Sequence, residues 1–217
     1  MKWGPSNIGK VMWGSSEIGK IYYGSSLVYQ SGASPGPQPD PYRTLDGIVF
    51  DGNVYYNTGI RLLGSDTLTF SFKASQNCNV LGCYTTTSAT TNYSLYVSTS
   101  SSAKYLRYGN GTYNSSMVAN TRYNVTITPT GSSGMRTNST WTAKTFTAGA
   151  DFLIGTTSTG ATSAKMTGIL YGNIEVAGRY VFVPSERIAD GAIGYLIQGT
   201  STFLTNQGSG TPTEYTS

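Results

Sequence analysis

Histidine is absent from this sequence, and only 11% of its 217 residues are charged. Histidine is the commonest general base, the commonest zinc ligand and the side chain that titrates near neutral pH. Without it, a serine or cysteine nucleophile lacks its usual base. The 14 Lys and Arg residues give a net charge of +4 and are scattered along the chain, whereas a nucleic-acid-binding surface needs clustered basic residues. We therefore expect no nucleic-acid partner.

Cysteine is scarce too. The two cysteines, Cys78 and Cys83, lie in the segment Cys-Asn-Val-Leu-Gly-Cys. If this segment is one strand, their odd separation places the side chains on opposite faces, so they cannot bridge each other, whereas a hairpin would allow a disulfide. Two free thiols fit assembly in a reducing cytoplasm.

Long apolar segments are missing as well. No run approaches the roughly 20 apolar residues of a membrane-spanning helix, so we expect no membrane partner. The start, Met-Lys-Trp-Gly-Pro-Ser, lacks the apolar run of a secretory signal. No stretch has the three-and-four spacing of apolar residues that predicts a helix.

Strand-forming residues are abundant instead. Ser, Thr, Asn and Gly are frequent and there are 17 Tyr residues; Tyr and Thr fit the half-buried surface of a sheet. In residues 67–74, Leu68, Phe70 and Phe72 alternate with polar residues, as in a strand with one buried face. Short strands separated by polar turns predict an all-β, two-sheet sandwich. The expected strands are 47–50, 54–58, 67–74, 80–84, 93–98, 104–108, 123–128, 152–155, 167–176 and 179–183.

The first 30 residues contain a repeat with a period of ten: Trp-Gly-Pro-Ser at 3–6, Trp-Gly-Ser-Ser at 13–16 and Tyr-Gly-Ser-Ser at 23–26. Each copy predicts a turn leading into a short strand, such as 18–23, with apolar residues on both faces. Three such strands cannot bury two apolar faces by themselves. We expect residues 1–30 to dock against another protein or against sister chains, the alternative being an appendage folded back on its own domain. The expected assembly residues are Trp3, Ile8, Trp13, Ile18, Ile21, Tyr23 and Val28.

A linker separates this segment from the rest of the chain. Residues 31–41 carry proline at alternate positions from 35 to 41, which favours extended polyproline conformation and prevents regular strand pairing. We predict three parts: a β-repeat segment at 1–30, a Pro-rich linker at 31–41 and a β-domain at 42–217.

Three segments of the β-domain resemble a known family. Residues 45–60, Leu-Asp-Gly-Ile-Val-Phe-Asp-Gly-Asn-Val-Tyr-Tyr-Asn-Thr-Gly-Ile, resemble the first hairpin of the laminin-G-like, concanavalin-like jelly-roll modules of phage and gut-bacterial surface proteins. Residues 182–195, beginning Phe-Val-Pro-Ser-Glu-Arg, and the tail 203–210, Phe-Leu-Thr-Asn-Gln-Gly-Ser-Gly, resemble its closing strands and turns. The repeats at 1–30 resemble Gly-Ser turn repeats at the ends of phage tail and fibre proteins. The resemblance implies a two-sheet concanavalin-like jelly roll with a short N-terminal β-repeat appendage.

Glycosidases occur on this fold, so paired carboxylates are the relevant signal. Retaining glycosidases need two carboxyl groups about 5–5.5 Å apart. No two of the ten acidic residues occupy alternate positions of one strand. Glu175 is expected on the same face as Tyr171 and Asn173, and only a distant residue could complete a pair. We expect no enzymatic activity. Arg187, between Glu186 and Asp190, is expected to form a local ion pair.

Aromatic side chains beside amides and hydroxyls are typical of glycan-binding surfaces, because rings stack on sugars while polar groups bind their substituents. Residues 92–96 and the run around the Gly-Asn-Gly turn at 109–111 offer this chemistry, and Trp141 is the one Trp outside the repeats. The alternative is that these tyrosines pack between strands. The predicted glycan-binding residues are Tyr93, Tyr96, Tyr105, Arg107, Tyr108, Asn110, Tyr113 and Trp141.

Together these features predict a phage virion appendage, a tail or head fibre assembled in the bacterial cytoplasm. Residues 1–30 would bind other virion proteins or sister chains, and binding to sister chains would give a homo-oligomer such as a trimer. The jelly roll would bind host-surface or environmental glycans weakly and multivalently. The alternatives are a structural decoration protein without sugar binding and a polysaccharide depolymerase. No cofactor is expected; the resemblance leaves calcium open, because some laminin-G modules bind it through Asp, Asn and carbonyl oxygens.

Overall fold

The structure is a computed structural model of the whole chain, which forms two compact units, Met1–Asp40 and Pro41–Ser217. We call the second unit the sandwich domain. It is described at residues 41–84, 91–97, 104–114, 117–158 and 165–217, with backbone only for residues 96, 97, 104, 105 and 114, and Asp40 before it is described too. In the first unit, the backbone is described for four strands between residues 12 and 30.

The first unit contains two small antiparallel pairs. β1 (Met12–Trp13) pairs with β2 (Ser16–Glu17), and β3 (Lys20–Tyr23) pairs with β4 (Ser26–Gln30). The Gly-Ser dipeptide of the repeat separates the two strands of each pair, which agrees with its predicted position before a strand. Of the expected assembly residues, Trp13, Ile21, Tyr23 and Val28 belong to these strands, whereas Trp3, Ile8 and Ile18 lie outside the described residues.

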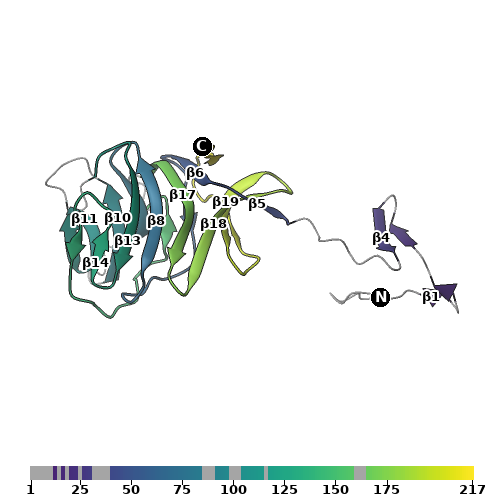
Figure 1. The fold of residues 1–217 in the computed structure, drawn as a ribbon, viewed down its shortest axis with the longest axis horizontal. Coiled ribbons are helices and arrows are strands. Elements are labelled where there is room, and N and C mark those ends of the chain that lie inside the picture. The colour runs from purple at the N-terminus through teal and green to yellow at the C-terminus, as the bar shows by residue number, and fades with distance from the viewer. Residues whose placement is uncertain are drawn as a thin grey trace. The chain divides into compact units, whose positions relative to one another are not determined.

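The sandwich domain consists of two antiparallel sheets packed against each other (Figure 1). One sheet has six strands. In spatial order these are β12 (Gly111–Asn114), β11 (Lys104–Gly109), β10 (Asn92–Val97), β9 (Cys78–Cys83), β16 (Leu153–Ile154) and β7 (Tyr56–Asn57).

The other sheet has eleven strands. Its main path can be followed in Figure 1 through β13, β8, β17 and β18. The full path is β15 (Ser139–Thr140), β14 (Gly131–Ser133), β13 (Arg122–Thr128), β8 (Leu68–Ala74), β17 (Thr167–Val176), β18 (Tyr180–Arg187), β19 (Ala192–Ile197) and β20 (Phe203–Leu204). Three further strands join it: β6 (Gly47–Asp51) pairs with β17 and with β21 (Thr213–Glu214), and β5 (Tyr42–Thr44) pairs with β18.

The core lies between the sheets and follows the alternation that the sequence predicts. In β8, Leu68, Phe70 and Phe72 are at most 2% exposed, while Thr69 faces solvent. Burying each such side chain contributes roughly 2 kcal/mol to stability. Each of the ten expected strands overlaps a strand of the structure, and the predicted all-β sandwich is confirmed. No helix with the length and hydropathy that a membrane crossing requires occurs in the described part of the chain.

Strand β9 corrects the expectation for the cysteines. Both thiols are free, but Cys78 and Cys83 lie in the same hydrophobic core cluster, not on opposite faces. The reason is a β-bulge: Leu81 pairs with Leu95 and Asn79 with Tyr96, so one residue of β9 is skipped and the alternation shifts by one. Burial raises the pKa of Cys78 to about 11 and that of Cys83 to about 12, which keeps both thiols protonated and unreactive.

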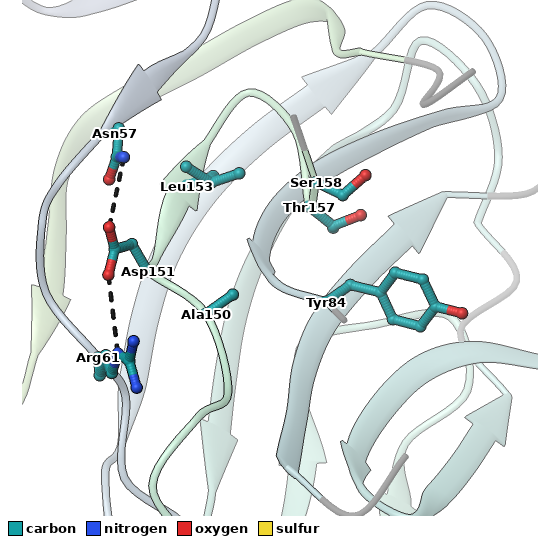
Figure 2. A pocket seen from close by; sticks show the side chains of 8 residues that line it. All are labelled: Asn57, Arg61, Tyr84, Ala150, Asp151, Leu153, Thr157 and Ser158. Carbon is teal, nitrogen blue, oxygen red and sulfur yellow. Dashed lines mark hydrogen bonds and ion pairs between the residues drawn. The ribbon is translucent and has the colours of Figure 1, made fainter. Parts of the chain in front are cut away.

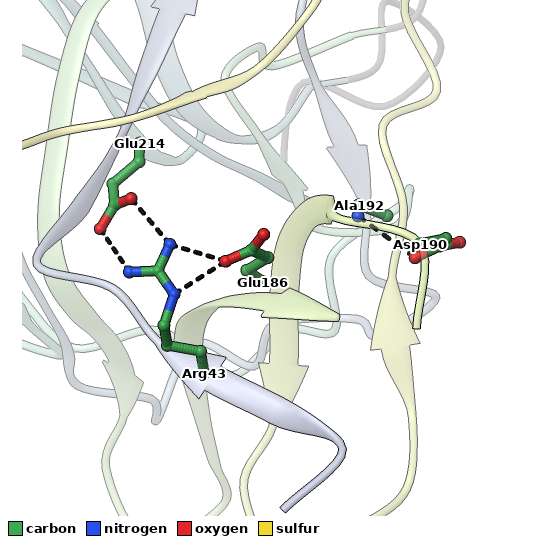
Figure 3. A network of polar contacts seen from close by, with 5 residues as sticks. All are labelled: Arg43, Glu186, Asp190, Ala192 and Glu214. Atoms are coloured by element: carbon green, nitrogen blue, oxygen red, sulfur yellow. Dashed lines mark hydrogen bonds and ion pairs between the residues drawn. The ribbon is translucent and has the colours of Figure 1, made fainter. Parts of the chain in front are cut away.

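A polar network joins distant segments where the sandwich domain begins (Figure 3). Arg43 on β5 donates from both terminal nitrogens to the two carboxylate oxygens of Glu214 on β21, each at 2.8 Å, and from Nε to Glu186 on β18 at 2.7 Å. Arg187 pairs with Asp190 at 2.6 Å as expected, whereas Glu186 binds Arg43 instead. The network therefore fixes the strand that follows the Pro-rich segment to two strands from the other end of the domain.

Candidate functional site

Two of the predicted glycan-binding side chains lie in the core. Tyr93 on β10 and Tyr108 on β11 are 0% exposed, and their rings meet edge to face at 5.8 Å between centroids. The Tyr108 hydroxyl donates to the carbonyl of Gly64 at 2.6 Å. Burial raises the pKa of Tyr93 well above its usual value. The prediction that these two rings bind a ligand was wrong, because strand alternation points them inward beside Leu95 and Leu106.

Trp141 and Tyr113 extend this aromatic packing to the edge of the six-stranded sheet. The Trp141 ring lies 5.1 Å from the Tyr108 ring and 4.6 Å from the Tyr113 ring, so it is enclosed between them. Asn110 is exposed at the adjacent turn. The structure thus brings four predicted residues together, Tyr108, Asn110, Tyr113 and Trp141, but the rings cover one another, as in the packing alternative that the sequence left open.

Arg107 leads to a different surface. Its guanidinium carbon lies 4.3 Å from the centroid of the Tyr84 ring, a cation–π arrangement on the outer face of the six-stranded sheet. Tyr84 directly follows β9 and is partly exposed. The side chains of Tyr96 and Tyr105 lie outside the described residues.

One cross-strand row connects Arg107 to the far side of this sheet. The strand registers align Arg107, Ser94, Gly82, Leu153 and Asn57 on neighbouring strands. This row faces away from the core, because adjacent residues such as Tyr56 and Ile154 are fully buried in it. Gly82 has no side chain and Ser94 has a small one, so little side-chain volume covers the sheet in the middle of the row. Arg107 and Asn57 at its two ends carry polar groups.

A hollow of about 370 Å³ lies at the Asn57 end of the row. Figure 2 shows Tyr84 on one side of it, and Asn57, Asp151 and Arg61 in a column on the other. We call it the Arg61 hollow. Its lining consists of Asn57, Arg61, Tyr84, Ala150, Asp151, Leu153, Thr157 and Ser158.

The polar column is joined by one long hydrogen bond and one long ion pair. Asn57 Nδ2 donates to Asp151 Oδ2 at 3.4 Å, and Arg61 Nε lies 3.8 Å from Asp151 Oδ1. The amide of Gly59, which has a φ of +67°, donates to Asn57 Oδ1 at 2.9 Å and forms a tight turn. The Thr58 hydroxyl donates to the carbonyl of Phe152 at 2.8 Å, which fixes this turn to the segment carrying Asp151.

This lining can bind a small polyhydroxylated ligand. The volume falls in the range of about 300–1,000 Å³ that is usual for ligand sites. Leu153 and Ala150 supply an apolar floor, Tyr84 a ring, and Asn57, Asp151 and Arg61 supply donors and acceptors. The Arg61–Asp151 pair is exposed, at 57% and 39% of the side chains, so it contributes little to stability and its groups can be shared with a ligand.

No group of three or more His, Cys, Asp or Glu side chains is placed to hold a metal ion among the residues whose positions are described. A direct test for calcium therefore accompanies the binding experiments below.

Sequence reasoning found Arg107 but missed the hollow beside it. Tyr84 was expected only as the end of a strand, and Asn57 only as part of a hairpin. Asp151 was considered only as a possible member of a pair of carboxylates at alternate positions of one strand. What joins these residues is the pairing of β16 with both β7 and β9, for which the sequence carries no local signal.

The chain matches no known family model, no curated protein and no solved structure.

Proposed function

We propose that this protein is a bacteriophage virion appendage, a tail or head fibre, whose sandwich domain is a concanavalin-like jelly roll that binds glycans in the Arg61 hollow. The observation that supports glycan binding best is the composition of this hollow. An aromatic ring lies on one side of it, apolar side chains lie in the middle, and a column of amide, carboxylate and guanidinium lies on the other side (Figure 2). Such a combination provides stacking and oriented hydrogen bonds together.

The charge of the surface indicates which glycans fit best. Arg61 and Arg107 bring two guanidinium groups, and Asp151 brings one carboxylate. A guanidinium pairs well with a planar carboxylate. The preferred ligand is therefore a hydroxyl-rich sugar chain that carries carboxylate groups.

Weak binding by one hollow becomes strong when several copies act together, because the second contact is intramolecular. The β-strand pairs of residues 12–30 and the Pro-rich segment that follows support this arrangement. The first would attach the chain to the particle or to sister chains, and the second would space the sandwich domain from it.

Binding is tested with the full chain, coupled in many copies to beads and applied to an array of bacterial glycans, with and without calcium. We expect saturable binding to acidic glycans, weakened about tenfold by Tyr84→Ala. The matched control is Tyr55→Ala, which removes a partly exposed tyrosine outside the hollow.

Other outcomes favour the alternatives. An absence of binding by folded, multivalent protein would contradict the proposal and favour a structural decoration protein. Release of shorter sugar chains would favour a depolymerase.

Attachment to the particle is tested by deleting residues 1–30. We expect the deletion to abolish incorporation into virions while the sandwich domain retains its cooperative unfolding. Incorporation at the wild-type level would contradict the anchoring role.

A further inference from the structure

A second hollow lies on the outer face of the eleven-stranded sheet, and its volume is about 510 Å³. We call it the Glu175 hollow. Asp46, Ser71, Arg122, Asn173, Glu175 and Tyr215 are among its lining residues. Since the Arg61 hollow lies on the outer face of the other sheet, the two open on opposite sides of the sandwich.

Local strand geometry creates the hollow. Tyr171 pairs with Ser71, and Glu175 pairs with Thr69, so four steps along β17 match two steps along β8. The additional residues form a bulge at Gly172, whose φ is +55°. The amide of Gly172 donates to the carbonyl of Asp46 at 2.8 Å, which holds Asp46 beside the bulge. Bulges commonly re-aim side chains at functional sites.

The two carboxylates of this hollow differ from the others. Within the described part of the chain, Asp46 and Glu175 are the acidic residues whose carboxylates have no hydrogen-bond or ion-pair partner. The others have partners: Asp51 accepts from backbone amides, and Asp66, Asp151, Glu186, Asp190 and Glu214 pair with arginines. Asp40 is also engaged.

The one arginine in the hollow does not neutralise these carboxylates by direct contact. The guanidinium carbon of Arg122 lies 4.2 Å from the centroid of the Tyr171 ring. Tyr215 packs its ring perpendicular to that of Tyr171, at 4.9 Å between centroids, and remains partly exposed itself. The Ser71 hydroxyl donates to Asn124 Oδ1 at 2.5 Å, so its oxygen remains as an acceptor. The hollow therefore offers two unpaired carboxylates, the amide of Asn173, the hydroxyl oxygen of Ser71 and part of an aromatic ring.

We propose that the Glu175 hollow is a second glycan-binding site, and that its ligand is a sugar bearing a free ammonium group. The ammonium lies between Asp46 and Glu175, where it donates charge-assisted hydrogen bonds. The sugar ring lies against Tyr215, and its hydroxyls bind Asn173 and Ser71. Arg107 beside the Arg61 hollow adds a second positive charge there, whereas the Glu175 hollow has two carboxylates and one arginine. This difference allows one sandwich domain to hold an acidic chain on one face and an amine-bearing chain on the other.

Overall charge does not produce this preference. The chain has a net charge of +4, which repels a polyamine at long range. Retention of an amine-bearing glycan must therefore come from a local site.

The test is calorimetric titration of the full chain with a hexamer of β-1,4-linked glucosamine, at a pH where its amines are protonated. The fully N-acetylated hexamer serves as the matched uncharged ligand. We expect saturable binding of the glucosamine hexamer and at least tenfold weaker binding of the N-acetylated hexamer. The double variant Asp46→Asn, Glu175→Gln should bind the glucosamine hexamer at least tenfold more weakly than the wild type does. Arg122→Gln should bind the amine hexamer somewhat more tightly, because it removes a nearby positive charge.

Controls separate this site from general charge effects and from the Arg61 hollow. Asp40→Asn removes one negative charge outside the hollow and should leave binding unchanged, as should Tyr84→Ala. An amine hexamer that does not bind, or that binds the double variant as tightly as wild type, would overturn the proposal. That result would leave acidic-glycan binding at the Arg61 hollow untouched, whereas loss of acidic-glycan binding alone would leave this proposal standing.

Discussion

The two hollows are made of similar side chains but differ in charge: one arginine and one aspartate line the Arg61 hollow, whereas one arginine and two acidic residues are in the lining of the Glu175 hollow. An arginine stacks on a lining tyrosine of each: Arg107 on Tyr84, and Arg122 on Tyr171. On the six-stranded sheet, however, the carboxylate of Asp151 is held by Asn57 and Arg61, whereas the carboxylates of the Glu175 hollow have no partner within the described residues. In our two proposals, the pairing of the charges, and not the residue types, therefore distinguishes the ligands of the two surfaces.

The first prediction contrasts a partnered carboxylate with an unpartnered one. Asp66 is 4% exposed, and its Oδ2 accepts from Arg179 Nη1 at 2.5 Å and from the amide of Leu63 at 2.7 Å. Asp66→Asn should lower the free energy of unfolding by about 2 kcal/mol, because it removes the charge of a buried carboxylate that accepts two hydrogen bonds, while Arg179 itself is partly in contact with solvent. Glu175→Gln should change it by less than about 0.5 kcal/mol. Urea unfolding of both variants checks this, and equal losses would refute the distinction.

The second prediction concerns glycines that let neighbouring strands approach closely, one in each sheet. A Cβ at Gly82 would lie 2.4 Å from the Cα of Ser94, and its φ of +140° is strained for any other residue. Gly82→Ala should cost about 3 kcal/mol, combining overpacking with backbone strain.

Two glycines separate these contributions. A Cβ at Gly47 would lie 2.5 Å from the Leu170 carbonyl, at a φ outside the left-handed region, so Gly47→Ala should cost about 2 kcal/mol. Gly178 has a φ of +72° and nothing within 4 Å of its Cβ position, so Gly178→Ala should cost about 1 kcal/mol. Chemical denaturation gives the ranking, and a larger loss for Gly178→Ala than for Gly82→Ala would contradict it.

The third prediction exchanges the ligands. Tyr84→Ala should weaken binding of acidic glycans about tenfold, or about 1.4 kcal/mol, and leave the glucosamine hexamer unaffected. Glu175→Gln should do the reverse. Titration of both variants with both ligands forms a two-by-two comparison. If either variant weakened both ligands equally, one shared site or a general loss of folding would explain the data better.

The sequence predicted the strands and the core of the two-sheet sandwich better than it predicted the hollows on its surface. Alternation in segments such as 67–74 identified strands whose inward side chains form the core, because alternation is a local property of the chain. Short strands such as β7 and β16 contribute only two residues each, and their neighbours are set by pairing with distant segments. Both hollows depend on such pairings.

The same limit explains the errors in the candidate residues. Tyrosine fits both a core and a binding surface, and only the strand register shows that Tyr93 and Tyr108 point inward. A single skipped residue in β9 likewise placed Cys83 in the same core cluster as Cys78. Glu175 was expected to stand alone with Tyr171 and Asn173; the fold adds Asp46 to them, from the bend before β6, more than 100 positions away in the sequence.

The last and smallest effect concerns carboxylates that are paired but exposed, near the start of the sandwich domain (Figure 3). The hydrogen bond from Arg187 lowers the pKa of Asp190 to about 2, and that from Arg43 lowers the pKa of Glu214. A carboxylate whose pKa is lower in the folded state stabilises that state above its unfolded pKa of about 4, and this contribution disappears as the pH falls toward 2. Exposure and salt keep the effect small.

We therefore expect the melting temperature to fall less steeply between pH 5 and pH 2 in Arg43→Gln and Arg187→Gln than in wild type. Arg136→Gln, which removes the same charge at an exposed position, should keep the wild-type slope. Added salt should reduce the difference between the variants, because it screens exposed pairs. An unchanged slope in both variants would mean that the network in Figure 3 positions the first strand without contributing to acid stability. The carboxylates of the hollows would then be distinguished from these by their availability to ligands and not by their contribution to folding.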